Sequence, residues 1–108
     1  MKLSLIFLII FSTNVFAGYV TTTGKITLIN NWEGHKGHLI KMQNMSQTTS
    51  LCSRNDYYIL PLDHIFVKEN YSLLLSARIS GADVTIRLSD SAANKCQENF
   101  PRIFHIQI

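Results

Sequence analysis

Two histidines in a short polar segment are the first candidates for a chemical site. His35 and His38 lie three residues apart in a glycine-containing stretch, a spacing at which one turn can hold two imidazoles near a metal ion. A protein metal site needs more ligands, and a third would have to come from His64, His105 or a carboxylate of unknown position. We therefore interpret the stretch as a solvated turn and predict no metal and no cofactor.

Trp32 is the candidate for contact with a ligand. It stands in the polar run 30–34, where turn-forming residues leave an indole little core to enter. An indole offers a broad apolar face and one N–H donor, which suits it to binding sugars or bases. The tyrosines, by contrast, are expected in the core or on sheet faces, and we assign Tyr57, Tyr58 and Tyr71 there.

Catalytic patterns are absent from the sequence. There is no nucleophile elbow, no metalloprotease helix and no phosphate-binding glycine loop, and the seven acidic residues are scattered singly. We predict that the protein is not an enzyme.

The first 17 residues have the organisation of a cleavable export signal. A positive start at Lys2 is followed by the apolar run 3–11 and by small residues at Val15 and Ala17. The apolar run is shorter than the 18 residues expected of a membrane-anchoring helix, which disfavours an uncleaved anchor. We predict a signal peptide at 1–17, a single domain at 18–108, no membrane span after cleavage, and a secreted or periplasmic location.

Export determines how the two cysteines are interpreted. Cys52 and Cys96 would enter an oxidising compartment, and two cysteines are too few for an all-cysteine zinc site, so we predict a disulfide between them. The formal net charge of +3 falls to +2 once Lys2 is removed. Such a small charge disfavours nucleic acid as a partner.

Residue periodicity predicts five strands and one helix. The strands are expected at 21–29, 38–43, 56–61, 84–88 and 102–108, and the helix at 68–80, with polar connections at 44–50 and 89–101.

Alternation also predicts which side chains face the core. Ile26 and Leu28 should share the inner face of the first strand, and Phe104, Ile106 and Ile108 one face of the last.

The two middle strands are also assigned faces. In the third strand Tyr57 and Ile59 should share one face and Tyr58 and Leu60 the other, whereas the strand at 84–88 should alternate cleanly.

The helix should pack through an apolar stripe. Its members are Tyr71, Leu74, Leu75 and Arg78, with the two leucines at its centre, and Gly81 follows where a left-handed cap belongs.

The order of elements, β-β-β-α-β-β, is that of an OB-fold-like five-stranded barrel, here with one disulfide. An open α+β sheet would also accommodate one helix and five short strands.

The chain resembles small secreted bacterial proteins related to the B subunits of AB5 toxins, including subtilase cytotoxin and pertussis-like B chains. The residues that carry this resemblance are 24–29, Cys52, 71–77 followed by 80–86, and 103–108. The resemblance implies an OB-fold, binding of cell-surface glycans and a ring of five subunits. No sugar-contact motif of that family is matched, so no site residue is carried over.

The expected function is that of an exported, non-enzymatic binding domain for a glycan or another protein, with homo-oligomerisation implied only by the resemblance. The alternative is a periplasmic inhibitor or an envelope-associated structural protein that has the same scaffold without a sugar site.

If the signal is cleaved after Ala17, the protein recovered from the periplasm or the medium should begin at Gly18, because the small residues at 15 and 17 suit the cleaving peptidase. N-terminal sequencing of the exported protein measures this. A chain that retains Met1 would contradict the prediction.

Overall fold

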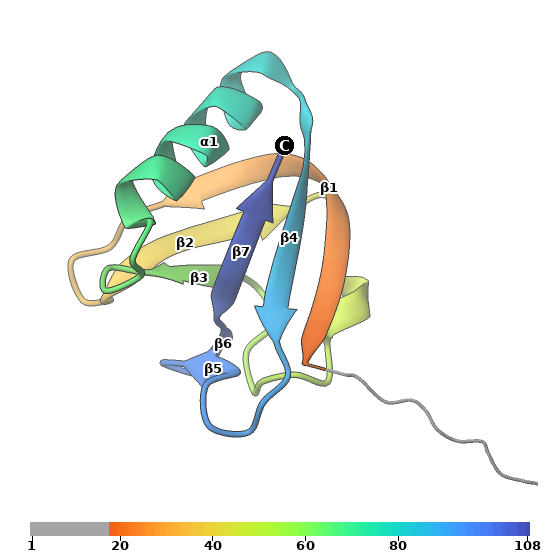
Figure 1. The fold of residues 1–108 in the computed structure, drawn as a ribbon, viewed down its shortest axis with the longest axis vertical. Helices are drawn as coiled ribbons and strands as arrows, with labels where there is room; N and C mark the ends of the chain where they lie inside the picture. The colour runs from red at the N-terminus through yellow and green to blue at the C-terminus, as the bar shows by residue number, and fades with distance from the viewer. Residues whose placement is uncertain (1–17) are drawn as a thin grey trace, which may run out of the picture.

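The computed structural model describes residues 18–108, so the predicted signal peptide lies outside the described residues (Figure 1). The elements in chain order are β1 (Tyr19–Asn30), β2 (Gly37–Met42), a short 3-10 helix (Ser46–Thr48), β3 (Tyr58–Pro61), α1 (Val67–Ser80), β4 (Asp83–Ser89), β5 (Cys96–Gln97), β6 (Phe100–Pro101) and β7 (Ile103–Gln107).

Five of the strands form one antiparallel sheet in the order β3-β2-β1-β4-β7. Strand β1 is long enough to pair with β2 along one half and with β4 along the other, and it curves strongly between them (Figure 1). Ile59 of β3 forms a single parallel bridge with Arg102, the residue before β7, and no continuous ladder closes the sheet. The predicted mainly-β fold, with one helix between the third and fourth sheet strands, is confirmed.

The hairpin β5–β6 was not predicted, because each of its strands is only two residues long. Glu98 and Asn99 form its turn, with φ angles of 54° and 75°. Two consecutive residues with positive φ are the geometry of a tight hairpin turn that follows the twist of its strands. The connection 89–101, expected to be a polar loop, therefore ends in a hairpin.

The main core lies between the concave face of the sheet and α1. It combines inward residues of every strand of the large sheet with two helix residues, and its fully buried members include Ile40, Tyr58, Leu60, Leu74, Ala77, Val84, Ile86, Leu88 and Ile103. The alternation predicted for 84–88 is confirmed.

A second, smaller core lies on the opposite face of β2 and β3. Leu39, Ile59 and Phe100 are buried there, with Tyr57 packed against them. Strand β3 is thus covered on both faces, and the predicted partition of its residues between two faces is confirmed. The cover on this side is β6, which supplies Phe100.

A bulge in β1 makes the prediction for Leu28 wrong. The register with β2 shifts between Ile26 and Leu28, because one extra residue is inserted there. Ile26 is buried, Leu28 is 40% exposed, and Ile29 packs against the core in its place.

The last strand departs from its prediction for the same reason. Its pairing with β4 shifts between the partners of Arg87 and Leu88, so that Ile103 and Ile106 turn inward. Phe104, predicted on the same face as Ile106, is 42% exposed. Ile108, also predicted there, lies beyond the end of β7 and is 60% exposed.

Helix α1 begins one residue before the predicted start and ends where predicted, with Gly81 in the left-handed conformation (φ 75°). The predicted stripe is wrong by about one position. The buried residues of the helix are Asn70, Leu74 and Ala77, whereas Leu75 is 38% exposed. Adjacent residues lie about 100° apart around a helix, so two neighbouring leucines do not both face the sheet centre.

The predicted disulfide between Cys52 and Cys96 is confirmed. It joins the segment before β3 to the start of β5. Closing a loop with a sequence separation of 44 stabilises the fold by about 4 kcal/mol in the chain-entropy model.

Leu74→Ala should lower the free energy of unfolding by about 2–5 kcal/mol, because it removes a fully buried side chain and leaves a cavity. Leu75→Ala, the neighbouring control, should cost about 1 kcal/mol or less. Chemical denaturation of the two variants measures the difference. Equal losses of unfolding free energy in the two variants would contradict the conclusion that Leu74, and not Leu75, faces the core.

Candidate functional site

Trp32 lies on the turn between β1 and β2, and its side chain is 61% exposed. This turn, light orange in Figure 1, projects from the sheet. The prediction that Trp32 lies outside the core is confirmed. The indole N–H donates a hydrogen bond to Asn30 Oδ1 at 2.8 Å, and the Trp32 carbonyl accepts one from the His35 backbone N–H at 3.1 Å. The exposed ring is therefore held in a defined orientation.

Depressions flank the indole on two sides. The larger, about 350 Å³, is lined by Asn31, Trp32, Glu33, His35, Gly37, His38 and Leu62. The smaller, about 60 Å³, lies toward the second core and includes Arg54, Tyr57 and Phe100.

Gly37 lies where the larger depression meets the start of β2. A Cβ atom at this position would lie 2.6 Å from the Leu60 carbonyl oxygen, so only glycine lets β2 approach β3 this closely.

His38 forms one wall of the larger depression. Its Nδ1–H donates to Asn31 Oδ1 at 2.7 Å, and its ring stacks on Tyr71 with centroids 4.0 Å apart. The Asn31 amide in turn donates to the Tyr71 hydroxyl at 3.0 Å. Burial lowers the pKa of His38, which favours the neutral ring. With Nδ1 as donor, the Nε2 atom of this neutral ring is an acceptor.

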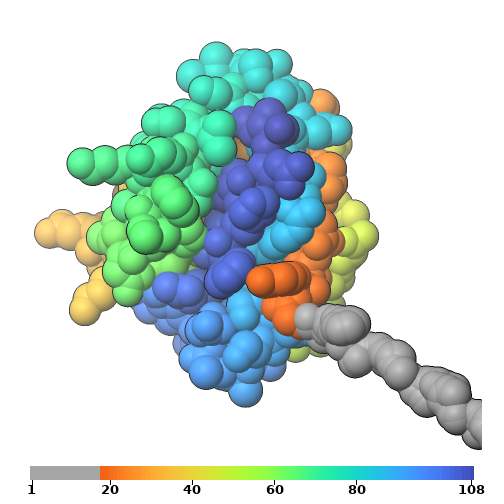
Figure 2. Space-filling view, viewed as in Figure 1, coloured from red at the N-terminus to blue at the C-terminus, as the bar shows by residue number. Residues whose placement is uncertain are grey.

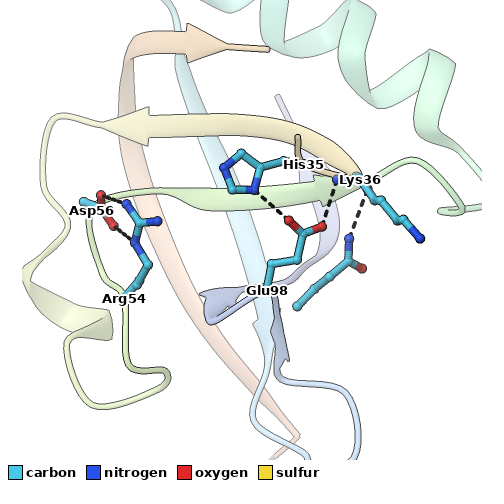
Figure 3. Close-up of polar contacts among 6 residues, drawn as sticks. His35, Lys36, Arg54, Asp56 and Glu98 are labelled. Carbon is cyan, nitrogen blue, oxygen red and sulfur yellow. Dashed lines mark hydrogen bonds and ion pairs between the residues drawn. The ribbon is translucent and has the colours of Figure 1, made fainter. Parts of the chain in front are cut away.

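His35 is held by Glu98, which reaches it from the β5–β6 turn (Figure 3). The Glu98 carboxylate accepts from His35 Nδ1 at 2.6 Å and from the Lys36 backbone N–H at 2.8 Å. The Gln97 amide donates to the Lys36 carbonyl at 3.0 Å. The Lys36 N–H and then His35 hold the pKa of Glu98 below its usual range, because both stabilise the carboxylate.

The two histidines do not converge on a common point. His35 bonds to Glu98 and His38 to Asn31, and residues 18–108 contain no group of three or more potential metal ligands. His64, which precedes α1, and His105, in β7, lie away from this turn.

Arg54 closes the smaller depression. Its guanidinium lies 4.4 Å from the centroid of the Phe100 ring and pairs with Asp56 at 2.7 Å (Figure 3). The Arg54 hydrogen bond lowers the pKa of Asp56. The guanidinium is thus fixed beside the aromatic wall of the second core.

Sequence reasoning found Trp32 but missed Glu98 and Asn31. Asn31 was seen only as turn composition, and Glu98 lies 63 residues from His35 in a stretch without periodicity. No local signal joined them.

The arrangement combines an apolar surface with oriented polar groups. An exposed aromatic face stands beside fixed amide, imidazole and carboxylate groups. A concave site with a few oriented polar groups is the usual form of a small-ligand site.

No family model, curated protein or solved structure matches the chain. None of the helices formed by residues 18–108 is long and apolar enough to cross a membrane.

Glu98→Gln should lower the melting temperature at neutral pH, because the lowered pKa of Glu98 means that its ionised form stabilises the folded state. That stabilisation is present above the ordinary glutamate pKa and is lost as the pH falls through the folded-state pKa. The difference in melting temperature between wild type and variant should therefore become smaller in acid. Thermal melts from pH 7 to pH 3 would measure this difference. Glu33→Gln, on the exposed turn, is the control, and a gap independent of pH would contradict the assignment.

Proposed function

We propose that this protein is an exported, non-enzymatic binding domain that recognises a cell-surface glycan through the turn between β1 and β2. The observation that carries the proposal is Trp32, an indole that is 61% exposed yet oriented by its hydrogen bond to Asn30. A large aromatic side chain in water gains free energy when an apolar surface covers it.

The chemistry around the indole fits a sugar. One face of a pyranose presents C–H groups that can cover the indole, and its hydroxyls both donate and accept hydrogen bonds. Glu33 and the Nε2 atom of neutral His38 supply acceptors, and the Asn31 amide is fixed between His38 and Tyr71. Because His38 and Asn31 are already oriented, little of their side-chain entropy is lost on binding.

An OB-fold-like architecture forms part of the proposal. Three antiparallel strands, a helix and two further strands, with β1 paired to both β2 and β4, are the arrangement expected of this fold. The parallel bridge from Ile59 to Arg102 lies where the barrel would close. OB-folds bind oligosaccharides and oligonucleotides through the loops between strands 1 and 2 and between strands 4 and 5. Trp32 and Glu98 lie on the corresponding connections.

Charge and redox state favour the same conclusion. A net charge of +3 for the whole chain gives little attraction for a phosphate backbone, which favours a saccharide over a nucleic acid. The disulfide is compatible with an extracellular or periplasmic protein. A ring of five subunits remains a prediction from the resemblance to toxin B subunits.

Trp32→Ala should weaken glycan binding about tenfold or more, because loss of a stacking partner costs ~1–3 kcal/mol, while Trp32→Phe should keep part of the affinity. The measurement is retention on an array of immobilised cell-surface oligosaccharides, followed by fluorescence titration with the best-bound one, since Trp32 is the sole tryptophan.

The matched control for this prediction is Tyr19→Ala, which removes another exposed aromatic ring from a different part of the surface. It should leave binding unchanged. If the wild type retains no glycan, or if Trp32→Ala destabilises the protein as much as Leu74→Ala, the proposal is wrong.

A further inference from the structure

A further cavity lies between the start of α1 and β7, away from Trp32. Its volume is about 520 Å³, and its lining residues are His64, Ile65, Phe66, Glu69, Asn70, Phe104, His105 and Ile106. In Figure 2 the green segment that leads into α1 lies directly beside blue β7. His64 joins the two segments, because its Nε2–H donates to the Phe104 carbonyl at 2.9 Å.

The walls of this cavity are large apolar side chains that remain in water. Ile65 is 83% exposed, Phe66 55% and Phe104 42%. Single exposed apolar residues are normal, but a contiguous group around a cavity marks a binding surface.

The cavity also contains a buried polar group without a partner. Asn70 is 7% exposed, and its backbone N–H bonds to the Phe66 carbonyl in the first helical turn. Among residues 18–108, no hydrogen bond engages its side-chain amide. Two of the other three buried polar residues do have side-chain partners: Thr48 bonds to Tyr58, and Ser89 bonds to Asn94.

An unsatisfied buried amide destabilises a fold, so its presence calls for a physical reason. Neither neighbouring histidine supplies a partner. Both ring nitrogens of His64 are engaged, by the Phe104 carbonyl and the Phe66 N–H; His105 Nδ1 accepts from Arg87, and no hydrogen bond among residues 18–108 joins His105 to Asn70. The free donor and acceptor of the Asn70 amide are thus left for a molecule inside the cavity.

We propose that this cavity binds a small neutral amphiphile. Its apolar body would lie against Phe66, Phe104 and Ile106, and its head group would both donate to and accept from the Asn70 amide. A neutral carboxamide or alcohol meets this requirement. An anionic head is disfavoured, because the one carboxylate among the lining residues is Glu69.

The test uses hexanamide and hexanoate at pH 8 as probes, with wild-type protein and Asn70→Leu. Calorimetry should show hexanamide binding to the wild type in preference to hexanoate. In Asn70→Leu the affinity for hexanamide should fall about tenfold, the effect of losing one or two hydrogen bonds. Without ligand, Asn70→Leu should melt at a higher temperature, since it removes the unsatisfied amide while keeping the number and branching of the side-chain heavy atoms.

Phe66→Ala is a second variant, in which an exposed side chain outside the core is truncated, so the fold should survive. It should also lose hexanamide affinity, whereas Trp32→Ala should not. Absence of hexanamide binding, equal affinity in Asn70→Leu, preference for hexanoate, or self-association of the chain through Phe66 would overturn the proposal. Each of these outcomes is independent of the glycan experiment.

Discussion

The double burial of β3 is the constraint on which much of the structure depends. Tyr58 and Leu60 face the main core, while Ile59 between them faces the other way and is equally inaccessible. A strand with apolar residues on both faces needs two covers. The sheet and α1 provide one, and Phe100 of β6 provides the other. A hairpin with two-residue strands has little stability of its own. The disulfide between Cys96 and Cys52 is therefore needed to hold the hairpin, and with it Phe100, against the second core.

The cover over Ile59 also assembles the candidate site. With Phe100 packed beside β3, the turn of the same hairpin projects Glu98 onto His35 and the Lys36 backbone. His35 in turn packs edge-on against Phe100, with ring centroids 5.6 Å apart, and contacts the Trp32 turn. The polar site and the apolar core beneath it therefore depend on the packing of the same hairpin. Non-glycine residues with positive φ at Glu98 and Asn99 are held by these contacts.

Sequence patterns predicted the elements and their order because side-chain periodicity reflects burial. They succeeded at β4, where an uninterrupted ladder with β1 keeps Val84 and Ile86 inward. They failed at Leu28 and Phe104, because a bulge moves the residues that follow it to the opposite face of the sheet. The alternation of apolar residues in the sequence does not reveal where such a bulge lies. The partner of His35 was also beyond prediction, because a contact across 63 residues depends on where the hairpin packs.

Helix α1 contacts residues of both proposed sites. Asn70 lines the cavity beside β7, while the next residue, Tyr71, stacks on His38 and accepts a hydrogen bond from Asn31. Consecutive helical residues point about 100° apart, so one turn of a rigid helix can serve both surfaces. Leu74, one turn further along, anchors that turn in the main core. The position of α1 on the sheet therefore determines the geometry of both sites at once, and a displacement of its first turn would alter the two together.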